Sequence, residues 1–285
     1  MSMNEGTLFV VATPIGNRAD ITERAINVLS DVDLIAAEDT RHSKLLLQFF
    51  NIATPLLTYH DHNEEARTPQ LIEKLLQGQN IALISDAGTP LVSDPGYRLV
   101  KAAHEAAIKV SPVPGACAAI AALSASGLAT DRYRFEGFPP AKSLARQSYF
   151  KGLIKESATL IFYESCHRIR ASLTDMADVF GEQRMAVLAR EITKAFETIR
   201  KAPLSELLAL VSGDENQRKG EFVIIIQGAE VDDTEPSIVQ VDVDRLLEIL
   251  VNELPVKQAS EIVARIAGTK KNQLYKKALK MKLSD

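Results

Sequence analysis

Three short loops rich in glycine, proline and aspartate contain residues that could bind a small molecule. The most unusual is SDAGTPLVSDPG at residues 85–96, which repeats the pattern Ser-Asp-x-Gly directly after the apolar run 81–84. The loops ATPIGN at 12–17 and PVPGACAA at 112–119 also follow apolar runs. Glycine allows close approach to the backbone, proline fixes a turn, and aspartate can accept hydrogen bonds from ribose hydroxyls. Each loop alone is typical of a structural turn, whereas three together favour a small-molecule pocket.

The three loops match neither of the common phosphate-binding motifs. No G-x-G-x-x-G follows a predicted strand, and G-x-x-x-x-G-K-[ST] is absent. The sequence therefore argues against a standard dinucleotide or ATP site.

Charged residues and histidines follow two other apolar runs, in AEDTRHS at 37–43 and YHDHN at 59–63. A charged residue at the end of a strand often only caps the next helix, and Asp39 or Thr40 could do so here. The H-x-H of residues 60–62 resembles a pair of metal ligands, but no cysteine supports it. We therefore predict no metal site.

The first 114 residues alternate between short apolar runs and amphipathic segments. Continuous apolar runs between helical patterns are typical of strands buried on both faces of a mostly parallel α/β sheet. Because ligands bind at the carboxyl ends of parallel strands, this sheet would bring the three loops together. The predicted strands are 7–13, 33–39, 55–60, 81–86 and 109–114, and a helix is predicted over 20–31 with Asp20 and Glu23 spaced as a capping box.

A change of pattern near 112–115 predicts a boundary between an N-terminal α/β domain, 1–114, and a C-terminal domain, 115–230. The second domain begins with a small-residue helix at 116–127. Several later strands follow one another with short connections, so its sheet is expected to be mixed or antiparallel. The predicted strands are 133–138, 159–165, 184–191, 197–203 and 220–228, with helices near 143–154, 167–180 and 204–211.

Residues 231–285 are predicted to form a helical, basic C-terminal extension. Residues 231–254 carry seven acidic residues and one arginine, whereas 255–285 carry eight Lys or Arg and two acidic residues. A basic final helix could contact a phosphate backbone, and a solvated helical appendage would show the same pattern. Three helices are predicted, at 246–254, 256–268 and 270–282, with Gly268 as a C-cap.

Composition limits the functional classes. The 285 residues are 46% hydrophobic, and a formal net charge of −4 does not indicate a nucleic-acid binder. Trp is absent and aromatic residues are few, so no stacking platform for single-stranded bases is evident. Cys117 and Cys166 form neither a metal motif nor a disulfide framework. Neither a signal peptide nor a membrane span is recognisable, so we predict a soluble, cytoplasmic protein.

Six segments resemble, in order and spacing, the ribosomal RNA small subunit methyltransferase I family. They are VVATPIGNRADIT, LIAAEDTRHS, SDAGTPLVSDPGY, TLIFYES, RE-I-TK and KGEFVIIIQG, and the basic tail is similar to the family's C-terminal helix-turn-helix-like extension. The resemblance implies the two-domain class III S-adenosylmethionine methyltransferase fold of the tetrapyrrole-methylase superfamily. It also implies S-adenosylmethionine as cofactor, a homodimer, and methylation of the 2′-hydroxyl of a cytidine in the decoding region of 16S rRNA within the small ribosomal subunit.

The same resemblance implies which residues bind the cofactor, between the two domains. Residues 85–96 become a cofactor loop, in which Asp86 and the backbone around Thr89 hold polar groups of the ligand. Cys117 as a cofactor neighbour competes with an ordinary buried thiol. The positions carried over from the superfamily are Ile15, Cys117, Ala118, Tyr163, Ala189 and Glu221.

Methyl transfer to a ribose requires the acceptor oxygen about 3 Å from the methyl carbon, in line with the sulfur, and removal of a proton from a weak acid. Histidine accepts protons near neutral pH, so His42 and His60 are candidate bases. Arg41 and Arg190 are candidates for positioning RNA, because the guanidinium fork suits phosphate. Each of these four residues also has a structural interpretation.

Two other functions remain compatible with the sequence. One is carbon methylation of a corrin or porphyrin precursor, which would need a pocket for a large anionic macrocycle and no basic tail. The other is a ribosome-associated factor that binds S-adenosylmethionine without catalysis, because the residues do not identify a base.

Overall fold

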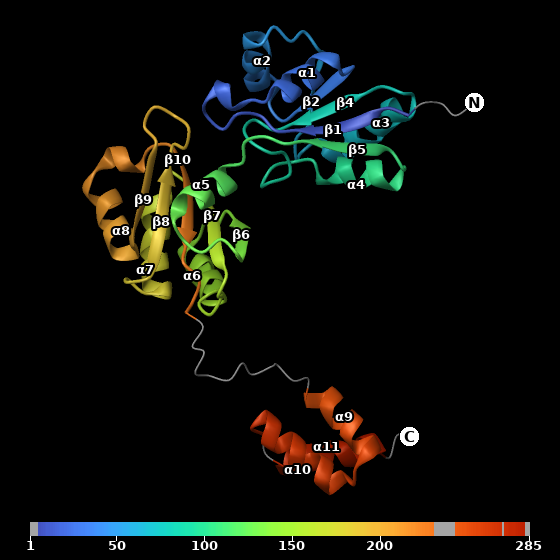
Figure 1. Cartoon of the computed structure of the whole chain (residues 1–285), viewed down its shortest axis with the longest axis vertical. Helices are drawn as coiled ribbons and strands as arrows, with labels where there is room; N and C mark the ends of the chain where they lie inside the picture. Colours follow the sequence, from blue (N-terminus) through green and yellow to red (C-terminus); the bar gives the residue numbers. More distant parts are fainter. Residues whose placement is uncertain (1–4, 231–242, 270, 283–285) are drawn as a thin grey trace. The chain divides into compact units, whose positions relative to one another are not determined.

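The computed structural model describes residues 5–230, 243–269 and 271–282. The chain divides into two compact units, residues 1–230 and 231–285, and the first of these contains two five-stranded sheets (Figure 1). The predicted boundary near residue 114 falls between the last strand of the first sheet, which ends at Val113, and the helix that begins at Ala118.

The first sheet is parallel throughout, with strand order β3-β2-β4-β1-β5, which confirms the predicted class. All four residues of β4 are buried, as expected of a strand covered on both faces. Helices α1 and α2 pack in one core and α3 and α4 in another. The strands are β1 Thr7–Val11, β2 Leu34–Ala37, β3 Leu56–Thr58, β4 Ile81–Ile84 and β5 Lys109–Val113, and the helices are α1 Glu23–Asp31, α2 Thr40–Phe49, α3 Glu64–Leu76 and α4 Tyr97–Glu105.

The helix predicted from residue 20 begins later, and Asp20 is not its cap. Thr22 is the N-cap of α1 and accepts a hydrogen bond from the Ala25 amide at 3.1 Å. Residues Arg18–Asp20 form a separate 3₁₀ turn, η1, which is capped by Asn17. A hydroxyl directly before the helix satisfies a free amide more locally than Asp20 could. Asp39 caps α2, as one of its two interpretations predicted.

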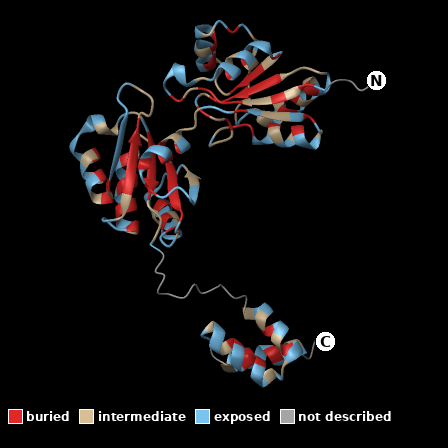
Figure 2. Ribbon diagram, in the orientation of Figure 1, coloured by how far each residue is buried: buried red, intermediate tan, exposed pale blue. Residues whose placement is uncertain are grey.

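The second sheet has the order β6-β7-β10-β8-β9, with β6 parallel to β7 and the other pairs antiparallel. This confirms the predicted mixed sheet, whose central strands are buried (Figure 2). Helices α6, α7 and α8 pack on one face and α5 on the other. The strands are β6 Tyr133–Gly137, β7 Thr159–Ser165, β8 Met185–Arg190, β9 Thr198–Pro203 and β10 Glu221–Ile226; the helices are α5 Ala118–Ser126, α6 Ser143–Lys151, α7 Ile169–Phe180 and α8 Leu204–Gly213, followed by the 3₁₀ turn η2 Glu215–Arg218.

The second unit consists, in its described part, of helices α9 Val243–Glu253, α10 Val256–Ala267 and α11 Lys271–Lys282. The three helices share a small apolar core that includes Leu247, Val263 and Ala278. Gly268 takes the left-handed conformation predicted for a C-cap, with φ of 61°. Part of the acidic stretch that precedes α9 lies outside the described residues. No helix in the described part of the chain has the length and apolarity needed to cross a membrane.

Candidate functional site

The three predicted loops meet at the carboxyl edge of the parallel sheet. Thr13 and Gly88 exchange two backbone hydrogen bonds, of 2.8 and 3.1 Å, which join the loops after β1 and β4. The Thr89 hydroxyl donates to the Ala116 carbonyl at 3.0 Å and so ties in the loop after β5. Gly88 has φ of +84°, and a Cβ there would lie 3.2 Å from Ile15 Cγ2. The loop therefore depends on glycine for both its backbone conformation and its close packing.

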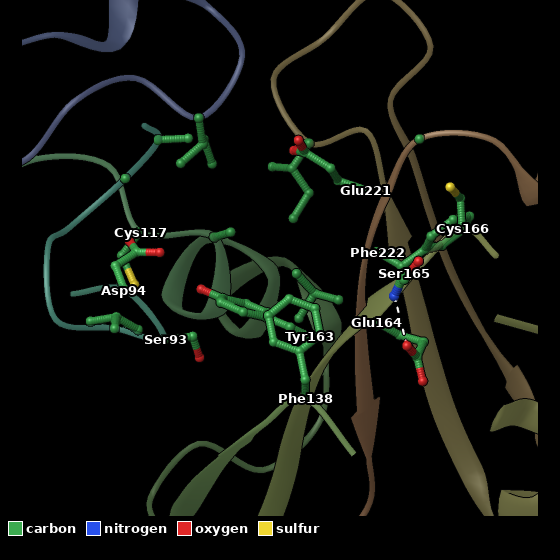
Figure 3. A pocket seen from close by; sticks show the side chains of 18 of the residues that line it. Ser93, Asp94, Cys117, Phe138, Tyr163, Glu164, Ser165, Cys166, Glu221 and Phe222 are labelled. Atoms are coloured by element: carbon green, nitrogen blue, oxygen red, sulfur yellow. Dashed lines mark hydrogen bonds between the residues drawn. The ribbon is translucent and has the colours of Figure 1, made fainter. Parts of the chain in front are cut away.

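A cavity of about 450 Å³ lies between these loops and the mixed sheet. We call it the larger cavity. Asp94 and Cys117 lie on one side and Glu164 and Glu221 on the other, with Tyr163 between them (Figure 3). Six of the eight residues predicted to bind the cofactor line it: Ile15, Thr89, Cys117, Ala118, Tyr163 and Glu221.

Two carboxyl groups near this cavity resist ionisation. Burial raises the pKa of Asp94 to about 6, and the nearby carboxylates Glu38, Asp86 and Asp61 add to the shift, while a hydrogen bond with Ser85 opposes it. Burial and Asp86 likewise raise the pKa of Glu38. A positively charged ligand would relieve this repulsion between like charges.

Tyr163 is fixed at the centre of the larger cavity. Its hydroxyl accepts a hydrogen bond from the Ala119 amide at 3.2 Å. Its ring contacts Phe135 and Phe138 edge-on, with centroids 4.8 and 5.7 Å apart. Burial raises the pKa of its phenol above the usual value, so the hydroxyl remains neutral at physiological pH. The ring presents a rigid, mostly apolar surface to a ligand.

A second cavity, of about 280 Å³, adjoins the first and shares Ile15, Ala87 and Glu221 with it. We call it the smaller cavity. Its remaining lining is more polar and carries basic side chains. It consists of Pro14, Gly16, Arg18, His42, Leu45, Leu46, Asp86 and Lys194.

Lys194, in the loop after β8, lines the smaller cavity and pairs with Glu221, which lines both cavities. Its ammonium group contacts Glu191 at 2.9 Å and Glu221 at 3.0 Å. Burial alone would lower the pKa of Lys194, but these two carboxylates raise it, so the side chain stays charged. The same loop packs on the first loop, where the Asn17 amide donates to the Thr193 hydroxyl at 3.1 Å. Lys194 is therefore a fixed cation and not a proton acceptor.

Two predicted cofactor residues do not line the larger cavity. Asp86 lines the smaller one, and its carboxylate accepts a hydrogen bond from the Asp39 amide at 3.0 Å. Asp86 thus fixes the start of α2 as well as facing the cavity. Ala189 is fully buried in the core beneath α5 and lines neither cavity. Its small side chain serves the packing of β8.

The four predicted catalytic and RNA-positioning residues are scattered. His42 lines the smaller cavity, whereas His60, Arg41 and Arg190 line neither of the two. His60 lies next to Asn63, whose side-chain amide is 3.4 Å from Nε2. Arg41 is 90% exposed and pairs with Asp39 at 2.7 Å. The ring of His60 packs edge-on against that of His62, and no group of three or more possible metal ligands occurs in the described part of the chain.

Arg190 was wrongly predicted as a contact for RNA phosphate. It is only 8% exposed, and its guanidinium donates to the carbonyls of Lys219, Phe196 and Asn216 at 2.8 to 3.0 Å. It also donates to the Thr198 hydroxyl. These bonds close the loops at one end of the mixed sheet, so Arg190 supports the fold.

Charged cavity residues that the sequence analysis did not propose include Asp94, Lys194 and Arg18. Asp94 belongs to the second Ser-Asp-x-Gly, and the repeat itself could have directed attention to it. Lys194 is the last residue of the segment RE-I-TK, from which only Arg190 was proposed as a functional residue. Arg18 follows ATPIGN directly and lies in the 3₁₀ turn η1.

Comparison with known proteins identifies the family. Residues 7–208 match the family model for Tetrapyrrole (Corrin/Porphyrin) Methylases, and residues 238–282 match that for the RsmI C-terminal HTH domain. The chain is 55% identical over 276 residues to the "Ribosomal RNA small subunit methyltransferase I" of Escherichia coli O157:H7, covering 97% of this chain and 96% of that protein. The chain belongs to the ribosomal RNA small subunit methyltransferase I family. A relative of the same name from Pseudomonas aeruginosa is 54% identical and covers 97% and 98% of the two chains.

Two solved structures, a uroporphyrin-III-C-methyltransferase and a diphthine synthase, share the fold of this chain. The uroporphyrin-III-C-methyltransferase of Thermus thermophilus superposes with a TM-score of 0.55 and 20% identity, over 78% of this chain and 94% of that one. Diphthine synthase gives a TM-score of 0.59 with 14% identity, over 78% and 90%. At these identities the comparison concerns the fold alone.

Proteins of this family are S-adenosylmethionine-dependent methyltransferases, and S-adenosylmethionine is therefore the methyl donor of this chain. The larger cavity fits that compound. Ile15, Tyr163 and Val223 offer apolar surface to an adenine, while Asp94 and Glu221 can face the positive charges of a sulfonium and an ammonium. Gly88 leaves its backbone accessible to polar groups of the ligand.

Proposed function

We propose that this protein transfers a methyl group from S-adenosylmethionine to the ribose 2′-hydroxyl of a cytidine in the decoding region of 16S rRNA, within the small ribosomal subunit. The observation that carries the proposal is the match to methyltransferases named for that subunit over nearly the whole length of both chains. The match includes the C-terminal helical region, 238–282, and not only the methylase fold.

We propose that the larger cavity binds the methyl donor and the smaller cavity receives the acceptor. The donor supplies an electrophilic methyl group attached to a positively charged sulfur. Tyr163 and the loop around Gly88 shape its binding surface, and Asp94 and Glu221 offset its charge. Because Ile15, Ala87 and Glu221 belong to both cavities, an acceptor in the smaller one lies next to the donor.

His42 is the proposed base. Of the two histidines predicted for this task, only His42 lines a cavity, and it lies on the acceptor side. His42 would accept the proton of the acceptor hydroxyl on a nitrogen of its imidazole while the hydroxyl oxygen takes the methyl group. The donor would be left as a neutral thioether, so charge would be conserved. Lys194 lines the same cavity, and its ion pairs with Glu191 and Glu221 hold it in place there.

The helical C-terminal unit is proposed to add affinity for the ribosomal subunit. Its last helix, α11, carries several lysines, of which Lys277 and Lys271 also pair with Asp244 and Glu261 within the unit. A basic helix gives sequence-independent affinity for phosphate. We further propose a homodimer that acts in the cytoplasm, as the family resemblance implies.

A single experiment distinguishes this function from its two alternatives. The protein is incubated with S-adenosylmethionine labelled in the methyl group and with small ribosomal subunits that lack the modification, or with a tetrapyrrole precursor. Label recovered in 2′-O-methylcytidine of 16S rRNA supports the proposal. Label in the macrocycle would identify a carbon methyltransferase, and binding of the donor without any transfer would identify a non-catalytic factor.

A further inference from the structure

One face of α2 presents apolar side chains to the smaller cavity instead of to the core. His42, Leu45 and Leu46 line the cavity, and Phe49 follows at the spacing that keeps these residues on one side of a helix. Leu45 is 61% and Phe49 56% exposed, whereas Leu47 is buried on the core side. An apolar stripe directed away from the core indicates a binding surface.

Arg18 lies over this stripe with an uncompensated charge. Its guanidinium carbon is 4.5 Å from the centroid of the Phe49 ring, and Phe50 packs edge-on against the same ring at 4.9 Å. Arg18 forms no ion pair with any residue that the structure describes, in contrast to Lys194, which contacts two carboxylates. Arg18, which lines the smaller cavity, therefore brings a guanidinium without a described ion pair next to the partly exposed ring of Phe49, which itself does not line the cavity.

We infer that Arg18 and Phe49 form a subsite for an unpaired RNA nucleotide, in which Arg18 contacts a phosphate and the exposed part of the Phe49 ring stacks on a base. This inference rests on the proposed function, because the methyl acceptor must be a polynucleotide. It assigns the acceptor strand to this side of α2, whereas Arg41 and Arg190 were predicted from the sequence to position the RNA.

The chemistry of the site matches an unpaired strand better than a paired one. Bases of single-stranded RNA stack on aromatic rings and guanidinium planes, and Arg is well suited to phosphate. The bases of a duplex are already stacked on one another and could not use the Phe49 ring. The subsite also adjoins the donor through Ile15, Ala87 and Glu221, so a nucleotide held there places a neighbouring ribose near the methyl group.

A second copy of this chain could cover the same stripe, because Leu45 and Phe49 are exposed and apolar. The free charge of Arg18 favours an anionic occupant instead, since an interface between copies would have to bury that charge without a partner. Self-association is therefore measured as part of the test.

The test compares variants of the full chain in methylation of unmodified small ribosomal subunits. Arg18→Ala and Phe49→Ala are the test variants, and Phe49→Leu retains an apolar side chain without the ring. Arg24→Ala, an exposed arginine of α1, and Lys44→Ala, on the opposite side of α2, are matched controls that line neither cavity. The readouts are KM for subunits, Kd for S-adenosylmethionine, and the dependence of subunit binding on salt.

We expect KM for subunits to rise by about tenfold in Arg18→Ala, Phe49→Ala and Phe49→Leu, with no change in Kd for S-adenosylmethionine. Arg18→Ala should also reduce the slope of log affinity against log salt by about 0.7, as expected for one lost phosphate contact to a single strand. The Phe49 variants should leave that slope unchanged. Both controls should behave as wild type.

Three results would overturn the inference. In the first, the wild type methylates subunits but the Arg18 and Phe49 variants do so with unchanged KM. In the second, Phe49→Ala alters the sedimentation of the protein alone, which would show that a second copy covers the stripe. In the third, the wild type transfers no label to rRNA; the proposed function then fails, and the subsite fails with it.

Discussion

The two cavities share three residues but differ in the charges they offer. The larger cavity has three carboxylates, those of Asp94, Glu164 and Glu221, and neither Lys nor Arg among the described residues that line it. The smaller cavity contains Arg18 and Lys194 together with two carboxylates, Asp86 and the shared Glu221, and Lys194 pairs with Glu221 at 3.0 Å. Arg18 is therefore the charge that distinguishes the smaller cavity from the larger one. A cationic donor suits the carboxylates of the larger cavity, and an anionic group of the acceptor would find its opposite charge at Arg18.

Closing the larger cavity should have the largest effect. Gly88→Val would place a branched side chain on a backbone with φ of +84°. The new Cβ would lie 3.2 Å from Ile15 Cγ2. We expect Kd for S-adenosylmethionine to rise on the order of a hundredfold, because backbone strain and lost space act together. Calorimetric titration with S-adenosylmethionine measures this.

Gly181→Val is the matched control for this variant. Gly181 also has a positive φ, of +97°, but no atom lies within 4 Å of its added Cβ, and it is outside both cavities. It should lower the thermal midpoint and leave Kd for the donor unchanged. A similar loss of donor affinity in both variants would mean that backbone strain, and not the cavity, explains the first result.

Removal of the helical unit tests whether the smaller cavity alone holds the acceptor. A chain that ends at Glu230 keeps both sheets and both cavities. We expect the affinity for subunits to fall by at least about tenfold, since two linked contacts bind more tightly than one. Kd for S-adenosylmethionine should not change. Full activity of the shortened chain on subunits would show that the helices serve another purpose.

Asp94→Asn tests the charge of the larger cavity through pH. With its pKa raised to about 6, Asp94 is protonated below that pH and ionised above it. The affinity of the wild type for its cationic donor should therefore increase as pH rises through about 6, by up to about tenfold. In Asp94→Asn the increase should be absent, and at pH 8 the variant should bind more weakly. Equal pH profiles would remove Asp94 from the donor site.

Asp94→Asn should bind the donor more weakly than wild type above about pH 6, but its fold should be more stable. Because the folded protein raises the pKa of Asp94, protonation stabilises the fold, and this stabilisation is lost as pH rises through about 6. Without donor, Asp94→Asn should be more stable than wild type above that pH, by about 1 kcal/mol after allowance for partial solvent exposure. Denaturant unfolding at pH 5 and pH 8 measures the difference.

The sequence predicted the sheets and the position of the site better than it predicted the task of each side chain. The buried strand β4 and residues 222–226 of β10 consist of continuous apolar residues, and this pattern depends little on tertiary detail. Glycine and proline likewise identify the loops from the local sequence alone. Convergence of the three loops followed from parallel topology alone.

Side-chain tasks depend on neighbours that are distant in sequence, and the prediction failed there. Arg190 looked available for phosphate because its partners, the carbonyls of Lys219 and Asn216, lie almost thirty residues away. Arg18 was missed because Phe49, the ring it covers, lies at the end of α2, about thirty residues further along the chain. The residues next to an arginine in the sequence do not show whether its guanidinium is buried against carbonyls or faces a cavity. Only the folded structure distinguishes these two cases.

Arg41→Ala should have the smallest effect on binding and stability, because Arg41 lines neither cavity. Arg41 is 90% exposed, and its only described ion pair is with Asp39 two residues earlier, a contact that screening by solvent makes weak. Asp39 can cap α2 without it, because the carboxylate accepts from the residue 41 amide. We expect unchanged stability, donor affinity and KM for subunits. A clear rise in KM alone would extend the acceptor surface beyond Arg18 to the start of α2, and the smaller cavity would then be only part of the RNA path.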